Sequence, residues 1–251
     1  MNEAILNRVI LVLYTILAFQ FLYAVLKNKS YKGELLLGLI IFPITYIVDS
    51  FLIGKLIGWY SGILKDIRVF DSFSLWSQFF ILFLVFDFFV YWTHRIYHSS
   101  DFFWCNHIIH HSGKHYSPHL KFRESFVTFL PTVFMPFFFL LGFDLSVIML
   151  NFLLILLIDT FNHFETKRRF PFVEYFIVTP RVHRLHHHIR NKKEVKNYGN
   201  ITLLWDHLFG TFELPSQKNI DAPIGVKNYE EPKNPIYACL KPFVDYFRGT
   251  K

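Results

Sequence analysis

Cysteine is scarce in this chain, and several familiar cofactor motifs are missing. The 251 residues include two cysteines, Cys105 and Cys239, which lie far apart in unlike surroundings. They indicate neither a disulfide framework nor a CxxC metal site. The HExxH pattern of zinc hydrolases is absent, which argues against that class. HPGG and GxGxxG are absent too, so the sequence predicts no fused haem or dinucleotide module.

Charge is also scarce, whereas apolar residues are abundant. Charged residues make up 18% of the chain, hydrophobic residues make up 53%, and 32 residues are phenylalanine. Soluble domains usually carry about a quarter of charged residues. One globular core cannot hide this much apolar surface, so we expect a lipid bilayer to act as a second solvent.

The formal net charge is +7, and basic residues gather outside the apolar runs, at 167–169, at 181 and 184, and at 190–193. Two interpretations stay open, a surface that faces anionic lipid headgroups and ordinary solvated loops. No recognised nucleic-acid-binding motif contains these residues, so no nucleic-acid partner is expected.

Four apolar runs are long enough to be candidate membrane-spanning segments. They cover 9–26, 35–59, 73–93 and 126–161. The first is expected to be an uncleaved signal anchor. The last is too long for one crossing of a core about 30 Å thick. Pro131 and Pro136 disturb its first half and 142–144 offers a turn, so we predict a helical hairpin there.

The expected fold is an all-α integral membrane protein with about three single spans and the hairpin. A His-rich helical region caps it on one membrane face, and residues 1–251 form one domain. All 13 histidines lie in two segments, 94–125 and 162–251, which this topology places on the same side. Lys27, Lys29 and Lys32 favour a cytoplasmic face for that side, although Lys65 and Arg68 weaken the signal.

Histidines recur at helical spacing in four places. HRIYH covers 94–98, HIIHH covers 107–111, HRLHH covers 183–187, and His163 follows Asp159 by one turn. Residues at i, i+3 and i+4 share a helix face. Thr179 before Pro180 predicts a helix start just ahead of the last motif. The candidate metal ligands are His94, His98, His107, His110, His111, His163, His183, His186 and His187.

Nine imidazoles exceed the needs of one tetrahedral ion and suit two metals that keep open positions. Imidazole binds zinc, copper, iron and nickel alike, so the residues do not select the metal. A single copy of the motif is explained by a surface helix with incidental histidines, but two copies are not. His207 is expected to be structural, and His119 is an intermediate case.

The ordered motifs resemble the fatty acid hydroxylase superfamily, also called the sterol desaturase family. The matching text is YWTHRIYH (91–98), WCNHIIHHS (104–112), NHFET (162–166), TPRVHRLHHHIRN (179–191) and NYGNITLLWDHLFGTFE (197–213). The similarity covers about 80–214. The pattern is most similar to the alkylglycerol monooxygenase-like and bacterial sterol desaturase-like branch.

The resemblance implies a di-iron enzyme that uses O2 to hydroxylate or desaturate an apolar membrane substrate, a sterol, a fatty acyl chain or an ether lipid. The reaction would begin with hydrogen abstraction from a C–H bond. The nine histidines carry over as the iron ligands. Electrons would come from a reduced pterin or from a separate electron-transfer partner, because no redox module is fused.

Six further residues are expected either to bind metal or to hold the ligand imidazoles. They are Asp159, His115, His188, Asp87, Glu165 and Asp206. Asp159 stands where some family members have another histidine, and we favour a supporting role for it. The stretch GKHYSPHLKFRES also departs from the family pattern, so a substrate entrance that differs from the family's is one interpretation of it.

Two alternatives remain, a membrane metal-binding or metal-transport protein and a zinc-dependent membrane hydrolase. Transport favours ionisable residues inside the spans, whereas the histidines are predicted outside them. The expected location is a bacterial inner membrane with the histidines on the cytoplasmic face, or the ER membrane in a eukaryote.

Overall fold

The computed structural model describes residues 32–63, 67–123, 129–216 and 219–249, with five isolated positions between 15 and 26. The predicted anchor at 9–26 therefore lies outside the described residues, those isolated positions excepted. Every regular element within the described ranges is helical, as predicted. Two isolated β-bridges, Ile177 with Thr202 and His188 with Ile224, join loops.

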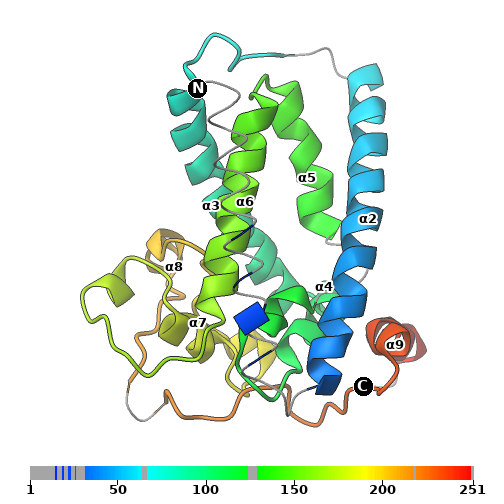
Figure 1. Cartoon of the computed structure of the whole chain (residues 1–251), viewed down its shortest axis with the longest axis vertical. Coiled ribbons are helices and arrows are strands. Elements are labelled where there is room, and N and C mark those ends of the chain that lie inside the picture. Colours follow the sequence, from blue (N-terminus) through cyan, green and yellow to red (C-terminus); the bar gives the residue numbers. More distant parts are fainter. Residues whose placement is uncertain are drawn as a thin grey trace.

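Three helices are long and apolar enough to cross a membrane, and their candidate spans are Leu36–Gly62, Leu75–Ser99 and Leu145–Asn162. They belong to α2 (Lys32–Ile63), α3 (Leu75–Ser99) and α6 (Leu145–Asn162). These helices run along the long axis of the molecule (Figure 1). The chain is thus an all-α integral membrane protein.

The span expected at 73–93 continues further than its apolar run. Helix α3 extends to Ser99, and Ser100 ends it by donating its N–H to the Ile96 carbonyl at 3.0 Å. His94 and His98 therefore occupy the last turns of the spanning helix, although the sequence placed them in a separate polar segment. Helical hydrogen bonding continues beyond the point where hydropathy falls.

The expected hairpin consists of α5 (Phe129–Leu140) and α6, joined by a turn. Gly142 has a φ of 87°, and a Cβ there would lie 2.8 Å from Arg68 Cα, so the close approach requires glycine. Asp144 caps α6 by accepting from Ser146 N at 2.8 Å. The described part of α5 has 12 residues and is about 18 Å long, too short to cross the bilayer.

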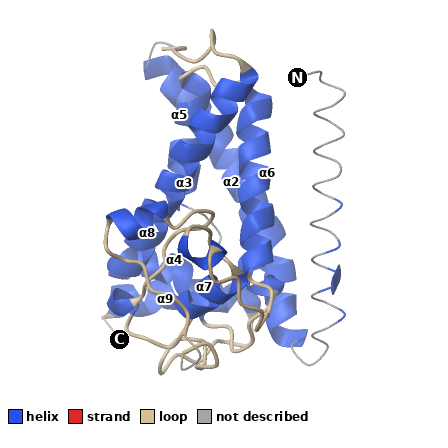
Figure 2. Ribbon diagram, turned by 90° about the vertical axis from the view of Figure 1, so that its left-hand side faces the viewer, coloured by secondary structure: helices blue, strands red, loops and turns tan. Residues whose placement is uncertain are grey.

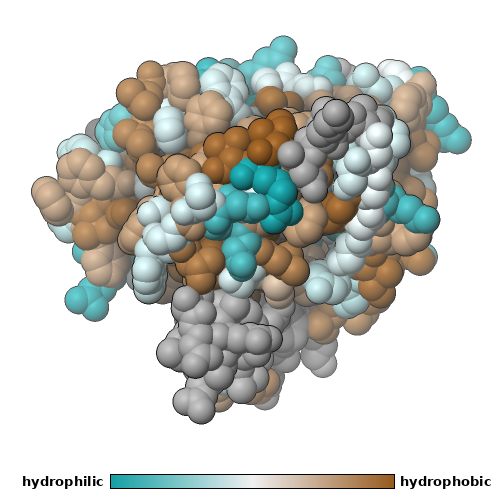
Figure 3. Space-filling view, turned by 90° about the horizontal axis from the view of Figure 1, so that it is seen from above, coloured by the Kyte–Doolittle hydropathy of each residue, from teal (hydrophilic) through white to brown (hydrophobic). Residues whose placement is uncertain are grey.

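Aromatic and aliphatic side chains fill the space between α3, α5 and α6. Leu82, Phe86, Phe138, Phe143 and Val147 form the centre of this cluster. Figure 2 shows these helices from the side, with most of the loops gathered at the end that carries α7 and α8. Large apolar side chains are exposed on the outside of the helices, as expected where the solvent is lipid. Seen from the end of the bundle that carries the 67–74 and 141–144 loops, apolar areas alternate with hydrophilic residues, which lie near the centre and along the edges (Figure 3).

The cap begins at a sharp corner. Ser100 ends α3 and also caps α4 (Asp101–His111), because its hydroxyl accepts from Phe103 N at 3.4 Å. Ile108 and Ile109 then pack into a core shared with Leu37 of α2 and Cys239 of α9 (Pro235–Arg248). One face of α4 is thereby fixed, and its histidine face turns back toward the end of α3.

The remaining short helices complete the cap around α4. They are η2 (Pro118–Phe122), η3 (Val173–Tyr175), α7 (Pro180–His186), η4 (Lys192–Glu194) and α8 (Leu204–Leu208). Thr179 caps α7 as predicted, by accepting from Val182 N at 3.4 Å. The buried ion pair of Arg181 Nε with Glu174, at 3.1 Å, anchors α7 to η3. Both HxxHH segments are therefore held on short, well-anchored helices.

Candidate metal centre

The structure brings all nine predicted histidines together in two adjacent groups. Within each group, one nitrogen from every ring lies within 4.8 Å of the others. The five-histidine group contains His94, His98, His107, His111 and His186. The four-histidine group contains His110, His163, His183 and His187. The two groups are in contact, because the rings of His111 and His187 stack with centroids 4.2 Å apart.

Each HxxHH motif divides its histidines between the two groups. On an α-helix, positions i and i+4 lie about 40° apart, whereas i+3 lies about 60° to the other side. Accordingly His107 and His111 face the five-histidine group while His110 faces the other. In α7 the arrangement is reversed, because the i and i+4 residues join the four-histidine group and His186 joins the five-histidine group.

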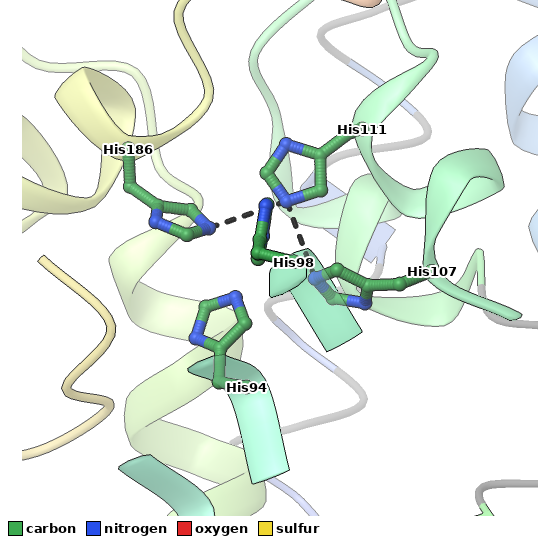
Figure 4. Close-up of side chains that lie close together, drawn as sticks. All are labelled: His94, His98, His107, His111 and His186. Atoms are coloured by element: carbon green, nitrogen blue, oxygen red, sulfur yellow. Dashed lines mark hydrogen bonds between the residues drawn. The ribbon is translucent and has the colours of Figure 1, made fainter. Parts of the chain in front are cut away.

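The five-histidine group draws on three helices, with two residues from α3, two from α4 and one from α7. Figure 4 shows its rings converging on a common space. The ring centroids of His94 and His186 are 4.3 Å apart, and those of His98 and His111 are 4.7 Å apart. His98 is completely buried, and neither of its ring nitrogens has a hydrogen-bond partner.

The four-histidine group is joined by His163, which ends α6. Its Nε2 lies 3.3 Å from His110 Nε2 and 3.1 Å from His183 Nε2. The C-cap position of a spanning helix thus meets the cap helices α4 and α7 directly. The group therefore lies at the end of the membrane bundle.

Backbone carbonyls fix the orientation of four rings. Since a carbonyl only accepts, the Nδ1 facing it must carry the hydrogen, which leaves Nε2 with a lone pair. These contacts join His94 to Tyr198 O, His110 to Leu120 O, and His186 to Lys196 O, each at 2.9 Å, and His163 to Asp159 O at 2.7 Å.

This arrangement leaves unprotonated nitrogens facing each other. Neutral His110 and His163 both carry their hydrogen on Nδ1, yet their Nε2 atoms are only 3.3 Å apart. The Nε2 of His94 is buried without any partner. Opposed lone pairs repel, and buried polar atoms without partners are costly. A cation between the rings removes both penalties, so the residues present fit metal ions.

Burial keeps these imidazoles in the neutral form that binds metals. Desolvation lowers the pKa of His163 from 6.5 to about 4. It also lowers the pKa values of the other rings outside the spanning segments well below 6.5, namely those of His107, His110, His111, His183, His186 and His187. At neutral pH the groups therefore present lone pairs rather than positive charges.

The carboxylate of Asp159 points toward a lysine. Its Oδ2 pairs with Lys121 Nζ at 2.8 Å, whereas Oδ1 lies 3.5 Å from His163 Nδ1. The backbone carbonyl of Asp159, at 2.7 Å, makes the shorter contact with that ring. This geometry favours a residue that orients His163, and Lys121 neutralises the charge beside the site.

Asp87 and Asp206 were candidates for direct imidazole contacts, but the hydrogen bonds described for them go to other groups. Asp206 accepts from Tyr198 N and Gly199 N, both at 2.8 Å. Asp87 accepts from Thr202 and from Trp205 Nε1. Both carboxylates therefore hold the loop that carries the Tyr198 carbonyl. That carbonyl, and neither carboxylate, contacts the ring of His94.

The other three candidates lie at the edge of the site. His115 pairs with Glu34 at 3.2 Å, and Glu165 is exposed beside a cavity of about 420 Å³. His188 is buried and lines a second cavity together with His111. His119 contacts Ser117 and Glu34, and Glu34 also pairs with Arg123.

The sequence did not predict the four backbone carbonyls that accept from the histidine rings. Every residue type has a carbonyl, so the identity of a residue does not indicate this role.

Comparisons with known proteins agree with this geometry. The fatty acid hydroxylase family matches residues 79–211, more than half of the chain. The histidine-lined helical membrane fold is thus that of a known class of proteins. This chain belongs to the fatty acid hydroxylase family.

Alkylglycerol monooxygenases are among its curated relatives. The chain is 32% identical to that of Homo sapiens over 137 residues, which cover 54% of this chain and 31% of the relative. It is 32% identical to that of Danio rerio over 156 residues, 61% of this chain and 34% of the relative. The chain therefore spans about a third of the length of these relatives. No solved structure matches the chain significantly.

Proposed function

We propose that this protein is a di-iron oxygenase that hydroxylates or desaturates the apolar part of a membrane lipid. The observation that carries the proposal is the pair of histidine groups whose unprotonated nitrogens face each other at the end of the membrane bundle. Membership of the fatty acid hydroxylase family supports it. When bound, the metal ions supply dioxygen activation strong enough to remove hydrogen from a C–H bond.

The protein supplies fixed, neutral donors for that chemistry. All nine histidines are proposed as ligands, and the four carbonyl contacts hold the donor nitrogens of their rings toward the ions. Asp159 and Lys121 orient His163 without adding net charge. Burial excludes bulk water from the rings, which protects a reactive oxidant from side reactions. The four-histidine group, with fewer donors, leaves more open positions for O2 and substrate.

The substrate would approach from the bilayer. Phe161 on the last turn of α6 is 52% exposed on the helix surface, while His163, two residues later, is completely buried. An alkyl chain beside α6 is therefore close to the four-histidine group. The named activity of the relatives makes an ether lipid the first candidate, ahead of a sterol or a fatty acyl chain.

Several further assignments rest on this proposal. Electrons are proposed to come from a reduced pterin or a separate redox partner. Most of the basic residues lie in the histidine-bearing segments, which supports a cytoplasmic face for the site, in a bacterial inner membrane or the ER membrane. Helix α9, outside the family match, packs on α4, which supports treating the chain as one domain.

Lipid analysis of an expressing host tests the function. Expression of the wild type should produce lipids that gain one oxygen or lose two hydrogens, and both products should disappear without O2. His110→Ala and His186→Ala, one from each group, should abolish them. His207→Ala is the matched control, because His207 lies outside both groups and bonds Tyr175 O.

Metal analysis of the same purified proteins separates the alternatives. Two iron ions per wild-type chain are expected. Zinc-only occupancy after expression with ample iron, with no oxygen consumption on any lipid, would exclude the oxygenase. Tightly bound metal without any oxygen-dependent product would instead support a metal-binding or metal-transport protein.

A further inference from the structure

Trp104 lies directly against the five-histidine group. Its ring centroid is 5.0 Å from that of His98, 5.4 Å from that of His111 and 6.2 Å from that of His107. Trp104 is on α4, about one turn ahead of His107, and its indole is only partly buried. One side chain thus contacts three proposed ligands of one ion.

The other side of the indole borders a cavity that opens on the cap. This Trp104 cavity has a volume of about 590 Å³, and its lining includes Trp104, His111, His188 and Lys192. Lys192 Nζ lies 5.9 Å from the Trp104 ring centroid and pairs with Asp101. Cavities of this size hold small molecules. Trp104 therefore borders both this space and the rings of His98 and His107, and His111 lines the space beside it.

No other described tryptophan has this placement. Trp92 packs on Tyr91 and Phe209, and Trp205 packs on Phe88. Trp59 contacts Tyr60 and Trp76 contacts Phe79. None of these four tryptophans has a ring contact described with any of the nine histidines. The indole of Trp104 is also a conjugated ring in contact with imidazole rings, which suits it to bridge electron transfer. The chain thus places an electron-rich ring at the point where the cavity meets the proposed ligands.

We propose that the Trp104 cavity receives a small one-electron reductant and that Trp104 relays its electron, as a bridge that does not itself change oxidation state, to an iron ion that the five-histidine group would hold. The reductant loses one electron, and a ferric ion gains it and becomes ferrous. This inference rests on the proposed function, because it requires an iron ion in that group. It adds the place where electrons enter and the residue that carries them.

Ascorbate is a suitable probe, because it is small and donates one electron with loss of one proton to the buffer. Iron-loaded ferric protein is mixed with ascorbate without O2 or lipid, and the loss of ferric absorption is timed. Trp104→Leu should slow reduction about tenfold, equivalent to about 1.4 kcal/mol of barrier. Trp104→Phe, which keeps a ring, should lie between. Trp92→Leu is the control and should reduce at the wild-type rate.

A second readout does not depend on turnover. Hydrogen peroxide added to the iron-loaded protein should oxidise Trp104, with one oxygen atom entering the indole and the other leaving as water. Peptide mass analysis should find this product in iron-loaded protein and not in zinc-loaded protein. Trp92 should stay unmodified in both.

The outcomes separate this inference from the function beneath it. If Trp104 only covered the site, Trp104→Leu would be reduced faster than the wild type, because the cavity widens. Faster reduction, or an unchanged rate, would overturn the relay and leave the proposed function standing. Iron content and the ferric spectrum before mixing show whether the variants still hold the ion. A wild-type protein that takes up no iron would overturn both the relay and the proposed oxygenase.

Discussion

Replacement of Asp206 by asparagine tests how a loop outside the metal centre supports it. The Asp206 carboxylate accepts from Tyr198 N and Gly199 N at 2.8 Å and from Thr211 Oγ1 at 2.7 Å. These bonds hold the loop whose Tyr198 carbonyl receives the Nδ1 hydrogen of His94. Asparagine keeps the shape, but its NH2 group faces a donor, so at least one buried N–H loses its acceptor.

The structure sets the size and the location of the effect. An unsatisfied buried N–H costs about 1–3 kcal/mol of folding free energy. Loss of a partner that orients a ligand typically weakens metal binding about 10–100-fold. Because His94 belongs to the five-histidine group alone, that loss should fall on one ion. The ion held by the four-histidine group should keep its affinity.

Competition with a graded series of chelators, followed by metal analysis, measures the two ions separately. Asp206→Asn should release one ion at lower chelator strength than wild type and the other at the same strength. Asp221→Asn is the control, since Asp221 is exposed and pairs with Lys167 on the surface. Equal weakening of both ions, or of neither, would refute the proposed link through the Tyr198 carbonyl.

Three further predictions address the ligands, the loop and the protons. His183→Ala leaves three donors in its group, whereas His94→Ala leaves four in its own. Metal analysis should therefore show a larger loss of bound metal for His183→Ala. The reverse order would contradict the division of the histidines into groups of four and five. In Gly199→Ala the new Cβ would collide with the Thr202 carbonyl oxygen, so thermal unfolding should show a loss of about 1–3 kcal/mol, and an unchanged midpoint would contradict the tight turn. Burial lowers the pKa of His163 from 6.5 to about 4, so the unfolded chain binds a proton in that window that the folded chain does not. Metal-free protein should therefore lose stability as the pH falls from about 6.5 to about 4, and a flat profile in chelator-treated samples would contradict the burial.

The sequence was sufficient for the features that repeat with a helical period. Hydropathy located the spans of α2, α3 and α6, and Gly142 with Asp144 marked the turn before α6. The HxxHH spacing placed three imidazoles on one helical surface. These features depend on local geometry, which a short stretch of residues fully determines.

The features that the sequence did not predict depend on contacts between distant segments. The extension of α3 through His98 depends on the corner at Ser100, where hydropathy gives no signal. The acceptors of the imidazole N–H groups are carbonyls, which every residue type carries. Asp206 looked like a direct partner of an imidazole, but the fold uses it to shape the loop that presents such a carbonyl.

The division of each HxxHH motif between two groups has a consequence for how the centre is built. Helix α4 gives two donors to the five-histidine group and one to the other, and α7 gives the opposite share. A rotation of either helix about its axis would therefore move donors of both ions together. The core face of α4, with Ile108 and Ile109 packed against Leu37, opposes that rotation. The two proposed metal sites are thus mechanically coupled, because packing on the far side of α4 positions the donors of both.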